Sequence, residues 1–78
     1  MKEFDAQLFG DILRELRKDK GYTQTVLGEY LHVQQHTISY YERGICLPNA
    51  QVLYELANLF HVSVDYLLGL NRTEQKRL

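Results

Sequence analysis

Apolar side chains recur along this chain at the spacing of amphipathic helices. Phe9, Ile12, Leu13 and Leu16 fall at i, i+3, i+4 and i+7, which is the stripe of a helix that buries one face. The stripe predicts a first helix over about residues 6–19. Gly21 follows it and is expected to stop it.

A second, shorter helix is predicted to follow directly. Thr23 is a suitable N-cap, because a threonine oxygen can accept a hydrogen bond from an N–H of the first turn. The inward residues expected for this helix are Val26, Leu27, Tyr30 and Leu31.

The next stretch, VQQHTISYYERG over residues 33–44, predicts an unusual third helix. It contains few of the best helix formers, and only Ile38 and Tyr41 are well placed for a core. Gly44 is expected to close it. Most of its side chains are polar or aromatic and can hydrogen-bond to a partner.

A fourth helix is predicted after the loop that contains Pro48. Its expected N-cap is Asn49, and its expected inward residues lie at i, i+3, i+4 and i+7: Leu53, Leu56, Ala57 and Phe60.

A fifth helix is predicted over residues 64–68, capped by Ser63 and ended by Gly69. The tetrapeptides LHVQ at 31–34 and FHVS at 60–63 share one pattern. They predict the same short turn twice, with His32 and His61 in the left-handed conformation that histidine tolerates. No run alternates in the manner of a strand, so the fold class is all-α with five short helices.

Length and composition favour a single small domain. The 78 residues carry no solenoid-length repeat, and residues 1–70 are expected to form the domain with 71–78 as a polar tail. One cysteine, Cys46, excludes an internal disulfide. No apolar run approaches the roughly 20 residues of a membrane span, and the N-terminus does not resemble a signal peptide. We therefore expect a cytoplasmic protein with no membrane partner.

Two helices joined by so short a turn, the second with one thin apolar seam, have the layout of a helix-turn-helix. On the third helix Gln35, His36, Ser39 and Tyr40 point away from Ile38 and the core. Glutamine can bond adenine bidentately, serine and histidine can reach base edges, and a tyrosine ring can touch a thymine methyl. This face suits the DNA major groove.

From about residue 9 to residue 70 the chain resembles the Xre/Cro-type, lambda-repressor-like helix-turn-helix regulators. The segments that carry the resemblance stand in the expected order: Leu16-Arg17-Lys18, Gly21, Thr23-Gln24, Leu27, Leu31-His32-Val33, Thr37-Ile38-Ser39, Tyr41-Glu42-Arg43-Gly44, Pro48 and Val64-Asp65-Tyr66-Leu67-Leu68-Gly69. The resemblance implies a compact five-helix DNA-binding domain. It would bind a palindromic, double-stranded DNA operator as a homodimer.

The resemblance also implies a role for particular positions. Base contacts are expected from Gln34, Gln35, His36, Ser39 and Tyr40, and phosphate contacts from Thr23, Gln24, Thr37, Arg43 and Ile45. Gln24 would use its side chain or its helix-end N–H, and residues 43–45 their backbone. Arg17 and Glu42 match an ion pair that bridges the first helix to the end of the third, although an ordinary solvated pair is the alternative.

Three features depart from this family pattern, of which the first is His32 in place of the usual turn glycine. Gly28 stands where relatives usually have alanine, at a cost of about 1 kcal/mol in helix stability. Ile45, Cys46 and Leu47 stand where many relatives have Lys or Arg. Ile45 and Leu47 either fold back onto the fourth helix or stay exposed, and an exposed apolar loop would suggest a dimer interface.

The near-neutral net charge of the chain leaves alternatives to a DNA-binding function open. The chain carries nine Lys and Arg against ten Asp and Glu, a net charge of −1, whereas phosphate binding usually leaves a basic excess. A transcriptional regulator, with repression as its expected action, is the main hypothesis. The alternatives are an antitoxin with the same domain, and a module with a protein partner that has lost DNA binding.

Enzymatic chemistry is not expected. No nucleophile is paired with a base, and a core this small leaves little room for a cofactor. His32 and His36 have a metal-like i, i+4 spacing but no third ligand nearby. We therefore predict no metal, no cofactor and no catalytic residue.

Overall fold

A computed structural model of the chain describes residues 3–70, and all of its regular structure in that range is helical. Five helices follow one another: α1 (Ala6–Asp19), α2 (Gln24–Leu31), α3 (Gln35–Glu42), α4 (Ala50–Phe60) and α5 (Val64–Leu67). The all-α prediction is confirmed. The expected polar tail, residues 71–78, lies outside the described residues.

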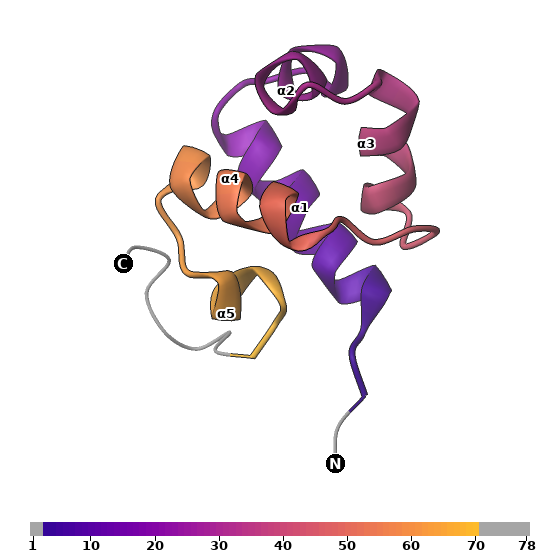
Figure 1. Cartoon of the computed structure of the whole chain (residues 1–78), viewed down its shortest axis with the longest axis vertical. Helices are drawn as coiled ribbons and strands as arrows, with labels where there is room; N and C mark the ends of the chain where they lie inside the picture. Colours follow the sequence, from indigo (N-terminus) through magenta and orange to yellow (C-terminus); the bar gives the residue numbers. More distant parts are fainter. Residues whose placement is uncertain (1–2, 71–78) are drawn as a thin grey trace.

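The helices pack around α1 and α4, with α2 and α3 grouped at one end and α5 at the other (Figure 1). Helix α3 packs against both α1 and α2, and α5 packs against both α4 and α1. One continuous core results, formed by Phe9, Ile12, Leu13, Leu16, Leu27, Leu31, Ile38, Tyr41, Val52, Leu56, Ala57, Phe60, Val62, Tyr66 and Leu67.

Side-chain caps begin four of the five helices. Oxygens of Thr23, Asn49 and Ser63 accept hydrogen bonds from backbone N–H groups of the first turns at 2.9–3.1 Å, which confirms the three predicted caps. Asp5 caps α1 in the same way, through the N–H of Leu8 at 2.9 Å, and this cap was not predicted. Each bond satisfies a donor that has no partner within the helix.

The two short turns also match the prediction. His32 and His61 follow α2 and α4 in the left-handed conformation, at φ 58° and 57°. The backbone N–H of Val33 donates to the carbonyl of Gly28 at 2.9 Å, and that of Val62 donates to Ala57 at 3.1 Å. The turn after α2 brings α3 into position beside α2.

Two expectations about helix faces and ends were wrong. Val26 and Tyr30 are 36% and 55% exposed instead of buried, because the two turns of α2 meet the core through Leu27 and Leu31 on the other side. On α4 the half-buried Leu53 packs against the core as expected, and the buried stripe also includes Val52. Helix α5 ends at Leu67, so residue 68 is its C-cap.

Glycine is required where two helices and a turn approach closely. A Cβ atom on Gly28 would lie 2.7 Å from the carbonyl oxygen of Val33, and one on Gly10 would collide with the carbonyl oxygen of Glu42. Gly10 therefore lets α1 meet the end of α3, and Gly28 lets the turn fold back onto α2. The departure from alanine at position 28 thus has a local packing reason.

Candidate nucleic-acid interface

A buried carboxylate at the end of α3 joins three elements of the fold. The side chain of Glu42 is fully buried, and its two oxygens accept from Nε of Arg17 at 2.6 Å and from Nη2 of Arg17 at 3.0 Å. Nε2 of Gln24 donates to the same carboxylate at 3.1 Å, and Nε of Arg14 lies 3.4 Å away. The structure thus brings Arg17 and Glu42 together in a buried bidentate pair.

The environment of Glu42 fixes its protonation state. Burial alone would raise the pKa of this carboxyl group, but hydrogen bonds from Arg17, Gln24 and Arg14 and the charge of Arg17 outweigh burial. The pKa of Glu42 is therefore lower than its ordinary value. The carboxylate stays ionised and holds α1 and α2 against the end of α3.

The same network reaches the outer surface through two glutamines. Oε1 of Gln24 accepts a hydrogen bond from Nε2 of Gln35 at 2.6 Å, while Nε2 of Gln24 donates to Glu42. The orientation of the Gln24 amide is thereby fixed, and Gln35 is held at one end. Oε1 and the second amide proton of Gln35 remain available to a ligand.

The outer face of α3 presents the polar residues that were predicted to contact bases. Gln34 is the N-cap of α3 but makes no capping hydrogen bond with its side chain. Gln34, Gln35 and His36 are exposed, Ser39 is half-buried, and Tyr40 is 38% exposed. These five side chains lie on one surface of the domain, while Ile38 and Tyr41 of the same helix are buried.

The N-terminus of α2 opens onto the same region. The hydroxyl oxygen of Thr23 accepts from the N–H of Val26 at 3.1 Å, and its carbonyl accepts from Leu27. Within residues 3–70 no partner takes the N–H groups of Gln24 and Thr25, which an α-helix leaves open at its start. An anion at this helix end is favoured by these donors and by the helix dipole.

The backbone N–H groups at the end of α3 donate within the domain. Gly44 and Ile45 close the helix: the N–H of Gly44 donates to Tyr41 at 3.2 Å, and the N–H of Ile45 donates to Tyr40 at 2.9 Å. The N–H of Arg43 donates to Ser39 at 3.0 Å. The phosphate contact expected from Ile45 stays a prediction, and the exposed Arg43 side chain is a further donor at this helix end.

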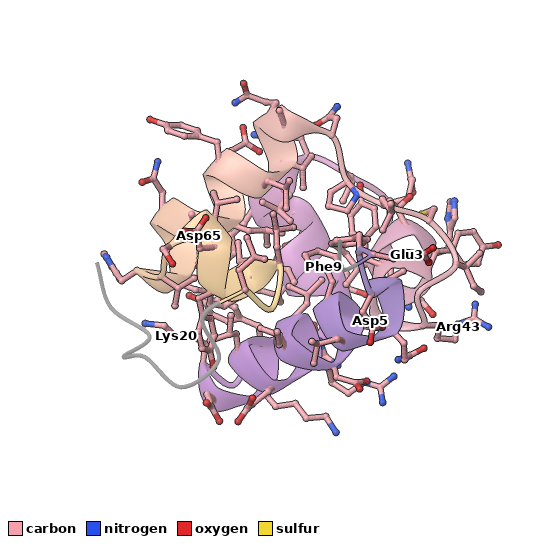
Figure 2. The ribbon with its side chains drawn as sticks, turned by 90° about the horizontal axis from the view of Figure 1, so that it is seen from below. Glu3, Asp5, Phe9, Lys20, Arg43 and Asp65 are labelled. Atoms are coloured by element: carbon pink, nitrogen blue, oxygen red, sulfur yellow. The ribbon has the colours of Figure 1, made fainter. Side chains whose placement is uncertain are left out.

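Acidic residues outnumber basic ones in the domain. Among residues 3–70, five Lys and Arg stand against nine Asp and Glu, and Arg14 and Arg17 are engaged with Glu42. Lys20 and Arg43 project from opposite edges of the domain (Figure 2). The described domain therefore has no excess of positive charge.

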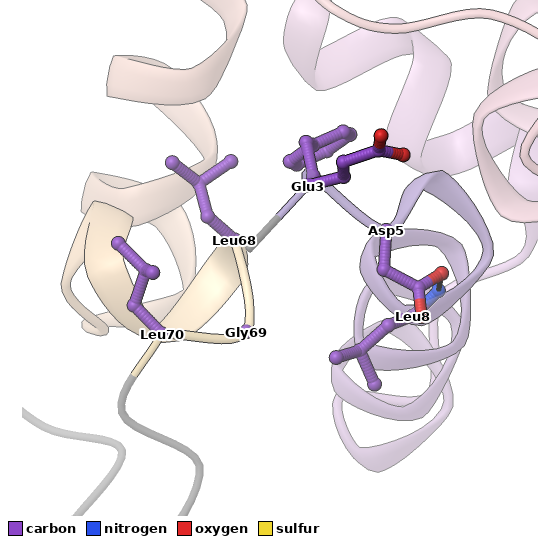
Figure 3. Close-up of a pocket in the computed structure, with 7 residues that line it drawn as sticks. Glu3, Asp5, Leu8, Leu68, Gly69 and Leu70 are labelled. Carbon is purple, nitrogen blue, oxygen red and sulfur yellow. Dashed lines mark hydrogen bonds between the residues drawn. The ribbon is translucent and has the colours of Figure 1, made fainter. Parts of the chain in front are cut away.

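Metal-ligand groups, hollows and membrane spans are the other kinds of feature that could carry a function in residues 3–70. Over the described part of the chain, no three His, Cys, Asp or Glu side chains group as metal ligands. A hollow of about 470 Å³ lies between the N-terminal segment and the end of α5, lined by Glu3, Phe4, Asp5, Leu8, Leu68, Gly69 and Leu70 (Figure 3). None of the residues that line this hollow belongs to α2 or α3. None of the helices in residues 3–70 has the length and hydropathy of a membrane span.

Comparison with known proteins decides the family. The family model described as helix-turn-helix matches residues 13–67, well over half of the chain. This chain belongs to the helix-turn-helix family. The match covers α2, α3, the turn between them and the Arg17–Glu42 pair. It also extends over α4 and α5.

Individual relatives agree with this assignment. The transcriptional regulator ImmR of Bacillus subtilis is 40% identical over 67 residues, which are 86% of this chain and 53% of ImmR. The transcriptional activator BcrR of Enterococcus faecalis is 38% identical over 61 residues, which are 78% of this chain and 30% of BcrR. The P22 c2 repressor, solved with a synthetic operator, aligns with a TM-score of 0.76 at 36% identity, over 82% of this chain and 97% of that one. The chain thus spans about half the length of ImmR and nearly all of the P22 c2 repressor chain.

Proposed function

We propose that this protein is a sequence-specific DNA-binding regulator of transcription that acts as a repressor. The observation that carries the proposal is the outer face of α3, where a fixed glutamine and further polar side chains stand on a rigid helix. Names of relatives support it: ImmR and BcrR are transcriptional regulators, and the P22 c2 repressor was solved with operator DNA.

Base readout is assigned to the amide of Gln35 first. Its Nε2 is anchored on Gln24, so the amide plane is set before DNA arrives. The free carbonyl oxygen and second N–H can accept from N6 and donate to N7 of adenine, the bidentate pattern available in the major groove. Gln34, His36, Ser39 and Tyr40 flank this amide and are assigned to neighbouring base pairs.

Phosphate contacts are assigned to the two ends of the helix-turn-helix. At the start of α2, Thr23 is exposed, and the N–H of Gln24 has no acceptor within residues 3–70. Since the Gln24 side chain is occupied by Glu42 and Gln35, its backbone N–H is the donor we assign. At the other end the side chains of Thr37 and Arg43 are assigned to phosphate oxygens. These contacts fix the register of α3 on the duplex.

A homodimer is part of the proposal. Few cations face the DNA, and each neutralised phosphate adds only about 0.9 to the salt slope, so two copies are needed for strong binding. Ile45 and Leu47 are 60% and 54% exposed, and an apolar loop of this kind supports a contact between two copies. The half-sites would then lie roughly 34–36 Å apart.

Selection from a random duplex library at about 50 mM salt tests the function. We expect a palindromic sequence to be enriched, and Gln35→Ala to lose the preference for adenine at one position of each half-site. The matched control is Gln51→Ala, the same chemical change at an exposed position of α4. Failure to enrich any duplex would contradict readout by α3, and an unchanged enriched sequence with Gln35→Ala would contradict readout by Gln35. The antitoxin and protein-interaction alternatives are not needed to account for the observations.

Sedimentation of the full chain with the enriched duplex tests the dimer. We expect two copies on each palindrome, and we expect Leu47→Lys to leave one copy on a single half-site. Glu29→Lys, an exposed charge change on α2, is the control. Two copies bound by Leu47→Lys with unchanged affinity would remove the loop from the interface.

A further inference from the structure

A stacked ladder of three side chains runs along the exposed side of α3. The rings of His36 and Tyr40 meet edge to face, with their centroids 5.6 Å apart and their planes at 70°. The guanidinium carbon of Arg43 lies over the Tyr40 ring, 5.3 Å from its centroid. The three residues are four and then three positions apart, so they share one stripe of the helix.

The ladder fixes the one large apolar side chain that α3 exposes. Of the large apolar residues of this helix, Ile38 and Tyr41 are buried in the core, while Tyr40 is 38% exposed. A guanidinium within about 6 Å of an aromatic centroid is attracted to the ring face. With an edge contact from His36 in addition, the Tyr40 ring is held in one orientation before any ligand binds. Preorganisation of this kind lowers the entropy that binding would otherwise cost.

A fixed apolar ring in the major groove has one kind of base feature to match. Base edges there offer hydrogen-bond donors and acceptors, and the only apolar group among the four bases is the C5-methyl of thymine. A 5-methylcytosine carries its methyl at the same ring position. The hydroxyl of Tyr40 can hydrogen-bond to other base edges, but the apolar ring itself finds an apolar match only in a C5-methyl group.

Resting on the proposed function, we infer that the His36–Tyr40–Arg43 ladder reads a C5-methyl group of a pyrimidine in each half-site. Tyr40 makes the contact, and Arg43 is a positioning residue that holds the ring. The inference adds a second role for Arg43 beside the proposed phosphate contact. A phosphate contact alone would not require the guanidinium to stack on the Tyr40 ring. The ladder also separates the readout of α3 into an amide that reads adenine and a ring that reads a methyl.

The test replaces each thymine of the enriched duplex by deoxyuridine, one position at a time, which removes only the methyl. We expect one position in each half-site to weaken binding about fourfold, the factor that corresponds to burial of one methyl group. Tyr40→Ala should bring the thymine-to-uracil ratio at that position to about one, and Tyr40→Phe should retain it. Tyr54→Ala is the matched control, since Tyr54 is an exposed tyrosine of α4.

Two further experiments ask which base carries the methyl group and whether Arg43 positions the Tyr40 ring. Comparison of cytosine with 5-methylcytosine at the sensitive position shows whether the ring reads the methyl on either base or on thymine alone. Arg43→Lys keeps the charge but loses the planar stack. We expect it to lower the thymine-to-uracil ratio while the salt slope stays unchanged, which a residue that serves only phosphate would not do. An unchanged ratio would remove Arg43 as the positioning residue.

The outcomes distinguish this inference from the proposed function. If a duplex is enriched but no thymine is sensitive, or if the sensitivity survives in Tyr40→Ala, methyl readout is overturned and DNA binding stands. If no duplex is enriched, both fail. Circular-dichroism melting of Tyr40→Ala checks that the variant is folded, which its exposed position leads us to expect.

Discussion

Removal of the Glu42 carboxylate should be among the most damaging single changes in this domain. The group is fully buried, and the Arg17 side chain that it neutralises is itself only 11% exposed. Glu42→Ala would leave the Arg17 charge buried without a counter-charge, with only the carbonyl of Tyr22 as an acceptor, a loss of about 3–5 kcal/mol in the free energy of unfolding. A chain of 78 residues has a total stability of about 4–12 kcal/mol.

The expected result can be measured by thermal melting. For a domain of this size 1 kcal/mol corresponds to about 4–8 °C in Tm, so Glu42→Ala should lower Tm by roughly 12–40 °C. Glu42→Gln keeps the shape and one acceptor and should lie between Ala and wild type. Glu15→Gln, an exposed carboxylate of α1, is the control and should melt like wild type.

A paired substitution separates the cost of a lone charge from the value of the pair. Arg17→Met combined with Glu42→Leu removes both charges, and burial of apolar groups of similar size often offsets the loss of an ion pair. We expect the double variant to melt well above Glu42→Ala. A Glu42→Ala protein that melts within about 4 °C of wild type would refute the reasoning, because that shift is what an exposed surface pair contributes.

Three other changes have predicted outcomes. Gly28→Ala should lower the free energy of unfolding by about 1 kcal/mol despite the better helix propensity of alanine, because its Cβ would lie 2.7 Å from the Val33 carbonyl oxygen. A Tm above that of wild type in thermal melting would contradict this. Since the pKa of Glu42 is lower in the folded than in the unfolded state, its contribution to stability is complete above the unfolded pKa and is lost as pH falls through the folded pKa. Wild type should therefore lose more Tm than Glu42→Gln on acidification, and parallel losses would count against the pair. Gln35→Ala should weaken binding to the enriched duplex by about 1–3 kcal/mol, measured by fluorescence anisotropy against Gln51→Ala, and equal affinities would exclude base readout by Gln35.

Helix positions were predictable because their signals are local. The caps Thr23, Asn49 and Ser63 act within three residues of themselves. The left-handed turns at His32 and His61 were visible as a repeated tetrapeptide. Such features depend on backbone geometry over a few positions and not on the rest of the fold.

Which faces are buried depends on tertiary packing, and there the sequence was less informative. Helix α2 has only eight residues and apolar side chains on more than one side, so its pattern did not separate Leu27 and Leu31 from Val26 and Tyr30. The packing of α2 against the other helices decides which of these four residues are buried. Similarly, the backbone N–H of Ile45 donates to the carbonyl of Tyr40 at the closed end of α3, and the sequence did not predict this hydrogen bond.

Part of the candidate site was visible in the sequence and part was not. The pairing of Arg17 with Glu42 followed from the family resemblance, but the addition of Arg14 and Gln24 to the same carboxylate requires three helices to be placed together. The His36–Tyr40–Arg43 ladder was missed although its i, i+4, i+7 spacing was present. That spacing on an exposed helix side is a signal for stacking when it joins aromatic and cationic side chains.

The buried pair and the reading face are parts of one hydrogen-bonded chain. Arg17 orients Glu42, Glu42 fixes the amide of Gln24, and Gln24 holds Gln35 at 2.6 Å. A substitution that weakens the first link should therefore loosen the last, even in a protein that remains folded. Glu42→Gln tests this, because an amide offers one acceptor oxygen in place of two and so cannot accept both from Nε of Arg17 and from the donors that share the other oxygen. We expect weaker binding to adenine-containing duplexes at temperatures well below its Tm. Unchanged affinity in a folded Glu42→Gln protein would mean that Gln35 is oriented by the DNA itself.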